Sequence, residues 1–169
     1  RVGGYENPGH HYTVRKYTVP AGILKTGKNA IAVRVMDHGA PGGIAGKPEQ
    51  LALQLGAERI SLANLWSFAS GANLDALDEQ ATLVGPKPGW NAEVTAWRAK
   101  LDANDPGMAG KWYASTFDDS KWKAMKLPKH YETAGLPDHD GTVWFRRAID
   151  VHIARGGKPI TLQLGAIDD

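Results

Sequence analysis

The stretch VWFRRAIDV, residues Val143 to Val151, carries the alternation on which the fold prediction depends. Val143, Phe145 and Ile149 fall on one face of an extended chain, and Trp144, Arg146 and Ala148 fall on the other. The same alternation occurs in AIAVRVMD at Ala30 to Asp37, LALQL at Leu51 to Leu55 and ITLQL at Ile160 to Leu164. Such patterns are typical of half-buried strands, so we predict an all-β fold.

The composition agrees with a β-rich globular protein and excludes several classes. Among 169 residues, 20 glycines and 10 prolines give the density of turn residues expected between short strands. The formal net charge of +2 is too small and too evenly spread for a nucleic-acid or anionic-membrane partner. No apolar run reaches the roughly 18 residues of a membrane helix. The absence of cysteine excludes disulfides, thiolate zinc sites and cysteine nucleophiles.

The middle of the chain is predicted to be helical and flexible. Asn91 can cap a helix whose apolar stripe runs to Leu101 and ends before Asp105. Asn73 to Gln80 is a weaker helical candidate. The GPKPG sequence at Gly85 to Gly89 separates the two and is typical of a linker.

The sequence contains none of the common catalytic motifs. Gly-x-Ser-x-Gly, Gly-Asp-Ser, a phosphate-binding glycine loop and His-Glu-x-x-His are all absent. Acidic pairs at Asp118-Asp119, Asp138/Asp140 and Asp168-Asp169 could offer oxygen ligands to calcium, but such residues in turns are more often caps or solvated surface. We therefore predict no catalytic residue, metal site or cofactor, with a structural calcium ion as the alternative.

The loop HYETAGLPDHD, His130 to Asp140, is the strongest candidate for a binding site, since loops on a rigid sandwich commonly carry function. Its polar side chains could hydrogen-bond sugar hydroxyls, and Tyr131 could stack on a pyranose. The alternative is a packed turn with Tyr131 and Leu136 against the sheet. We expect this loop and the glycine-rich loop from His38 to Gly46 to lie at one end of the sandwich. The candidate carbohydrate-binding residues are His130, Tyr131, Glu132, Asp138, His139, Asp140 and His38.

Two groups of motifs resemble a known family. The first is KWYASTFDDSKWKAMKLPKHYETAGLPDHDGTVWFRRAID at Lys111 to Asp150, followed by LGAIDD at Leu164 to Asp169. It is similar to the sugar-binding jelly roll of glycoside hydrolase family 2, and more closely to the jelly roll inserted in bacterial sialate O-acetylesterase-like carbohydrate esterases. The second is YTVPAGILKTGKNAIAVRVMDHGAPGGIAGKPEQLAL at Tyr17 to Leu53, with ISLANLWSFASG at Ile60 to Gly71. It resembles the later strands and the exit of the same domain.

The two groups occur in reversed order relative to that family. The resemblance therefore implies a galactose-binding-like jelly-roll β-sandwich with one or two short helices, in circularly permuted order. Residues 1–71 would form the C-terminal half of the roll, residues 72–110 a helical, flexible connector, and residues 111–169 the N-terminal half. The alternative is the tail of one roll and the head of another, which would leave two open half-sandwiches with unpaired edges.

The resemblance also implies a function. It indicates a non-catalytic accessory domain of a carbohydrate O-acetylesterase, in which a separate domain supplies the nucleophilic serine. The domain would brace the esterase domain or shape its sugar cleft. Its partners would be that esterase domain and an acetylated oligosaccharide, in a periplasmic or secreted location. An independent carbohydrate-binding module and a structural spacer are the alternatives.

Overall fold

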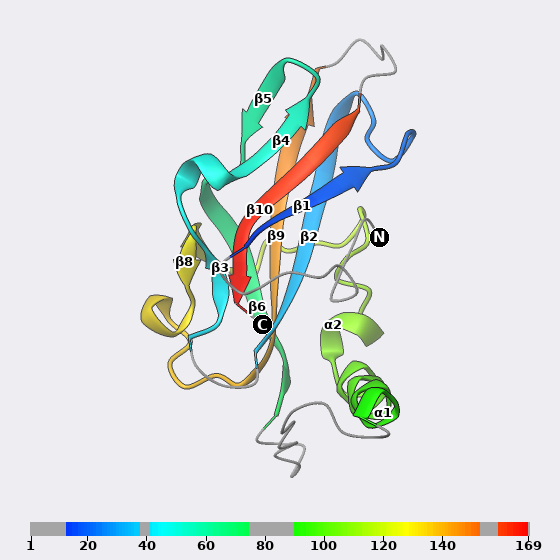
Figure 1. Cartoon of the computed structure of the whole chain (residues 1–169), viewed down its shortest axis with the longest axis vertical. Coiled ribbons are helices and arrows are strands. Elements are labelled where there is room, and N and C mark those ends of the chain that lie inside the picture. The colour runs from blue at the N-terminus through cyan, green and yellow to red at the C-terminus, as the bar shows by residue number, and fades with distance from the viewer. Residues whose placement is uncertain (1–12, 38–40, 75–89, 153–158, 169) are drawn as a thin grey trace.

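Two antiparallel β-sheets form a sandwich in the computed structural model, which describes residues 13–37, 41–74, 90–152 and 159–168 (Figure 1). This confirms the predicted all-β sandwich. The strands are β1 (Val14–Val19), β2 (Gly27–Asp37), β3 (Gly43–Ala45), β4 (Leu51–Leu55), β5 (Glu58–Ser61), β6 (Asn64–Asn73), β7 (Lys123–Leu127), β8 (Lys129–His130), β9 (Gly141–Val151) and β10 (Ile160–Asp168). The helices are α1 (Trp90–Ala103) and α2 (Pro106–Ala109).

The first sheet is built around β10. One edge of β10 pairs with β1, and the other pairs first with β4 and then with β3, so that Leu162 lies opposite Leu53 and Ala166 lies opposite Ala45. β5 continues the sheet beyond β4, and β8 continues it beyond β3. Strands of both sequence halves therefore pair with one another in this sheet, which faces the viewer in Figure 1.

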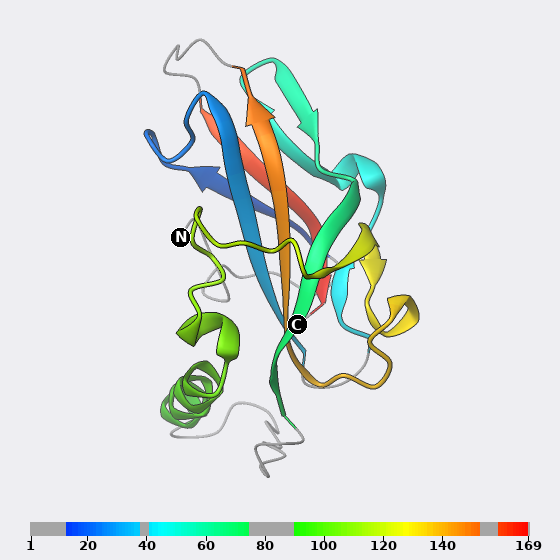
Figure 2. The ribbon, with the colours of Figure 1, turned by 180° about the vertical axis from the view of Figure 1, so that it is seen from behind.

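The second sheet has the order β2-β9-β6-β7. β2 and β9 pair along their full lengths, from Gly27 opposite Val151 to Asp37 opposite Gly141. This register places Val33 beside Phe145 on the inner face and Arg34 beside Trp144 on the outer face. Figure 2 views the molecule from this side.

One apolar core lies between the two sheets. Val35 and Phe145 from the second sheet and Leu53, Leu162 and Leu164 from the first are all buried in it. The predicted strands at 30–37 and 160–164 therefore belong to one sandwich, because their inward side chains share this interior. The hydrophobic effect of this shared burial joins the two sheets.

The described helices of the connector lie against the outer side of the second sheet. α1 covers the predicted helix but begins at Trp90, so that Asn91, predicted as the cap, lies inside it, and α2 follows directly. In Figure 2 the chain after α2 crosses in front of the second sheet on its way to β7. Asn73, proposed as the start of a weak helix, instead ends β6. The rest of that helix, and the proposed linker at residues 85–89, lie outside the described residues.

Candidate functional site

The described parts of the two predicted loops meet at one end of the sandwich. β3 pairs with β8, with Gly43 opposite His130 and Ile44 opposite Lys129. Beyond this ladder, the Tyr131 amide donates a hydrogen bond of 3.1 Å to the Gly42 carbonyl. The backbone thus places the loop of residues 130–140 beside residues 41–46.

Tyr131 is the internal anchor of this loop pair. Its side chain is fully buried, and its hydroxyl donates to Asp37 Oδ2 at 3.2 Å. A ring with no exposed face cannot stack on a sugar, so the predicted stacking role of Tyr131 is wrong. The packed-turn alternative describes this side chain, and Leu136 also packs against the core. Burial, with the negative charges of Asp37 and Glu132, raises the pKa of Tyr131, which keeps the hydroxyl protonated and able to donate.

Glu132 ties the second loop to the first. Its Oε1 accepts a hydrogen bond of 2.6 Å from the Gly42 amide, while its buried Oε2 has no hydrogen-bond partner in the described part of the chain. Only glycine fits at position 42, because an added Cβ atom would overlap Tyr131 Oη and Asp37 Oδ2. The glycine in the first loop is therefore required by the buried side chains of the second.

Three further predicted residues, Asp138, His139 and Asp140, form the rim of the same loop. Asp138 is exposed and has a φ of 51°, whereas His139 and Asp140 are half-buried. The His139 Nε2 lies 3.2 Å from the Thr142 carbonyl, so this nitrogen carries the proton that it donates. His130 is half-buried beside Gly43, and His38 lies outside the described residues. Among the residues that the structure describes, no three His, Asp or Glu side chains are grouped to hold a metal ion.

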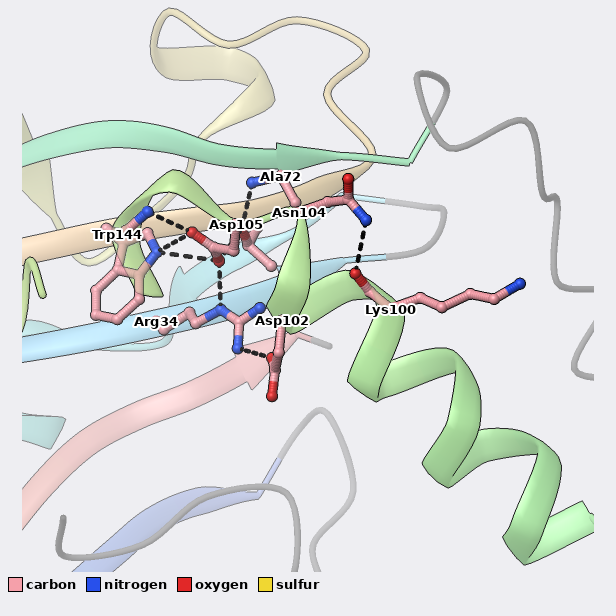
Figure 3. Close-up of polar contacts among 9 residues, drawn as sticks. Arg34, Ala72, Lys100, Asp102, Asn104, Asp105 and Trp144 are labelled. Carbon is pink, nitrogen blue, oxygen red and sulfur yellow. Dashed lines mark hydrogen bonds and ion pairs between the residues drawn. The ribbon is translucent and has the colours of Figure 1, made fainter. Parts of the chain in front are cut away.

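A second polar cluster, which the sequence did not reveal, lies on the outer face of the second sheet (Figure 3). Its centre is Asp105, whose side chain is fully buried and which caps α2 by accepting from the Gly107 amide at 2.7 Å. Asp105 Oδ1 also accepts from Trp144 Nε1 at 3.0 Å, and Oδ2 accepts from Thr142 Oγ1 at 2.8 Å. Arg34 Nε forms an ion pair with Oδ2 at 2.7 Å.

This Asp105 cluster holds the connector on the sheet. Arg34 comes from β2, Thr142 and Trp144 come from β9, and Asp105 lies at the junction of α1 and α2. Both oxygens of Asp105 are occupied by protein groups, so the carboxylate is not available to a substrate. Asp-Pro-Gly at the start of α2 is a common capping sequence, but nothing local to it indicates the partners on the strands.

Aromatic side chains extend from this cluster along the segment between α2 and β7. Trp112 meets Trp144 edge-on with ring centroids 6.2 Å apart, and Trp122 meets Trp112 in the same manner at 4.9 Å. Tyr113 stacks on Trp144 at 6.4 Å and is itself 53% exposed. Arg146 of β9 donates to the Trp112 carbonyl from the sheet below. The segment between α2 and β7 is thus packed on the outer face of the second sheet, and the ring of Tyr113 is exposed on it.

Comparison of the chain with protein-family models, with curated proteins and with solved structures returns no match. In the part of the chain that the structure describes, no helix is long and apolar enough to cross a membrane.

Proposed function

We propose that this chain is the non-catalytic β-sandwich of a carbohydrate O-acetylesterase similar to the sialate O-acetylesterases. In this proposal a separate domain supplies the catalytic serine, and the sandwich braces that domain and shapes the rim of its sugar cleft. The sandwich itself would be a circularly permuted jelly roll. Its partners would be the esterase domain and an acetylated oligosaccharide outside the cytoplasm.

The observation that carries this proposal is the meeting of the two family-like loops at one end of the sandwich. Tyr131 and Glu132 hold the loops together from inside, through Asp37 and the Gly42 amide. A rim fixed by its own buried contacts loses little conformational entropy when it contacts a partner or a substrate. The small entropy loss of such a fixed rim supports a role in positioning the sugar cleft of a neighbouring domain.

The test uses the parent esterase with Asp138→Ala and His139→Ala combined. We expect slower turnover of an acetylated oligosaccharide and unchanged turnover of a small acetyl ester, because the rim would contact only the extended substrate. Asp150→Ala with His152→Ala is the matched control, since this exposed Asp–His pair lies at the opposite end of β9. Unchanged turnover of the oligosaccharide in the first variant would remove the proposed role of the rim.

A second candidate, an independent carbohydrate-binding module, is favoured by Tyr113. An exposed aromatic ring that stacks on a buried indole is a rigid platform of the kind that packs on a sugar face. If this candidate is correct, the chain alone binds oligosaccharides and Tyr113→Ala abolishes binding. If the accessory role is correct, Tyr113→Ala leaves oligosaccharide turnover by the parent enzyme unchanged.

A further inference from the structure

The end of β9, residues 147–151, has a strand partner on one side only. β2 pairs with all of these residues, whereas β6 pairs with β9 only as far as Arg146. Asn64 to Trp66, where β6 begins, pair with β7 instead, and Figure 2 shows β6 bending away from β9 toward β5 at this end. In the part of the chain that the structure describes, residues 147–151 therefore form a free strand edge in the middle of the second sheet.

Arg147 lies at the start of this free edge and faces the interior of the sandwich. Its neighbours on the same face of β9, Phe145 and Ile149, are both buried in the core. The Arg147 guanidinium donates to the Leu62 carbonyl at 2.5 Å, and desolvation lowers the pKa of Arg147. No carboxylate of the described residues forms an ion pair with it. A partly desolvated cation of this kind attracts a carboxylate more strongly than a fully hydrated cation does.

We propose that residues 147–151 of β9 form a docking site for an extended, acidic segment of a partner polypeptide. The segment would pair with the free edge of β9 as an added strand, a recurring mode of peptide recognition. It would place an aspartate or glutamate side chain beside Arg147. The inference goes beyond the proposed function, because it holds whatever reaction the partner catalyses.

The backbone and the charge together select a peptide over a small anion. A free strand edge offers a row of N–H and C=O groups, which an extended peptide can satisfy and an inorganic anion cannot. Directly opposite residues of paired strands have Cβ atoms about 4.5–5.5 Å apart. A carboxylate opposite Arg147 is therefore within reach of its guanidinium, whose planar N–H groups can form charge-assisted, bidentate hydrogen bonds.

The surroundings of the edge are compatible with this partner. Asp150 lies on the outer face of β9, where it forms an exposed pair with His152 and lies opposite Lys28, so its charge is balanced and directed away from Arg147. Leu65, near the point where β6 leaves β9, is 60% exposed and offers apolar surface to a partner. On the inner face of residues 147–151, Arg147 is the only charged side chain, so it determines the preference for an acidic segment.

The experiment is a calorimetric titration of the full chain with a capped heptapeptide of alternating threonine and valine that has glutamate in place of the central valine. The same peptide with glutamine at the centre is the uncharged probe. We expect the glutamate peptide to bind about fivefold or more tightly. We expect Arg147→Gln to remove this preference, while Arg147→Lys, which keeps the charge, retains part of it.

Arg59→Gln is the matched control. Arg59 lies on β5, is exposed, and donates to the Glu49 carbonyl, so the variant makes the same change in charge and also alters a bond to a backbone carbonyl. It should retain the preference for the glutamate peptide. Equal binding of the two peptides by wild type, no binding of either, or an equal loss in Arg59→Gln would overturn the proposal.

Strand pairing is tested separately with two N-methylated glutamate peptides, one methylated at the odd positions and one at the even positions. Alternate N–H groups of a strand point to opposite edges, so one of the two peptides should lose binding and the other should keep it. Slower amide hydrogen exchange within residues 147–151 should accompany binding of the unmethylated peptide. If neither methylated peptide loses binding, or if inorganic phosphate at equal concentration displaces the glutamate peptide, the site is a general anion site and the proposal fails.

Discussion

Replacement of Asp105 by alanine should strongly destabilise the protein, because it removes the acceptor shared by three elements. The variant leaves the Trp144 indole N–H, the Thr142 hydroxyl and the Gly107 amide buried without their acceptor. Each buried donor left unsatisfied costs about 1–3 kcal/mol. Removing one partner of a buried ion pair costs about 3–5 kcal/mol. Because Arg34 is 21% exposed and keeps a second carboxylate, Asp102, these costs do not add in full. We expect the free energy of unfolding to fall by about 3–5 kcal/mol.

The assay is urea unfolding followed by tryptophan fluorescence and far-ultraviolet circular dichroism. Asp102→Ala is the internal control, since Asp102 also pairs with Arg34, at 2.5 Å, but is 48% exposed. An exposed pair contributes about 0–1 kcal/mol, so this variant should unfold close to the wild-type midpoint. If Asp105→Ala loses less than about 1 kcal/mol, or no more than Asp102→Ala, the cluster does not hold the connector and the reasoning fails.

Three further predictions concern the loops and the start of β6. Tyr131→Phe should flatten the pH dependence of stability above about pH 10. Because the pKa of Tyr131 in the folded state is raised above 10.0, the tyrosine of the unfolded state loses its proton first as the pH rises. This titration should lower the free energy of unfolding of wild type, but not of the variant, by up to about 1.4 kcal/mol per pH unit in urea titrations. Parallel curves for the two proteins would contradict this. Gly42→Ala should lower the unfolding free energy by about 1–3 kcal/mol, because its Cβ overlaps Tyr131 Oη and Asp37 Oδ2; a thermal midpoint equal to that of wild type would show that the loops adjust freely. Asn64→Gly should raise the thermal midpoint by about 2–4 °C through relief of the positive φ, and a lowered midpoint would show that the conformation is not strained.

The strands that form the core could be predicted from the sequence because their constraint is local. A strand buried on one face needs an apolar residue at every second position, as at Ile31, Val33 and Val35. The α1 helix was predicted for a similar reason, since its stripe ends at Leu101, which is buried. β2 begins at Gly27, before the predicted strand at Ala30, because its first residues are polar and show no alternation.

The candidate site was only partly predictable, because its geometry depends on distant partners. The loop of residues 130–140 was identified from its length and composition, but these do not tell which way Tyr131 points. The ring turns inward because Asp37, 94 positions earlier, offers a buried acceptor at the end of β2. Likewise, Trp144 and Asp105 are 39 positions apart, and only the packing of the α1–α2 junction on the outer face of the second sheet brings them together. Long-range polar contacts of this kind leave no periodic signal in the sequence.

The segment between α2 and β7 links the polar cluster to the edge of the second sheet. After α2 the chain crosses the outer face of the second sheet and enters β7, the edge strand that carries Lys126 (Figure 2). Along this path it is held by Asp105 at one end and by Arg146 beneath Trp112 in the middle. A segment anchored at both points fixes where β7 begins. The Asp105 cluster therefore acts on the position of this edge strand, and its loss should displace β7 only to the extent that β7 detaches from β6.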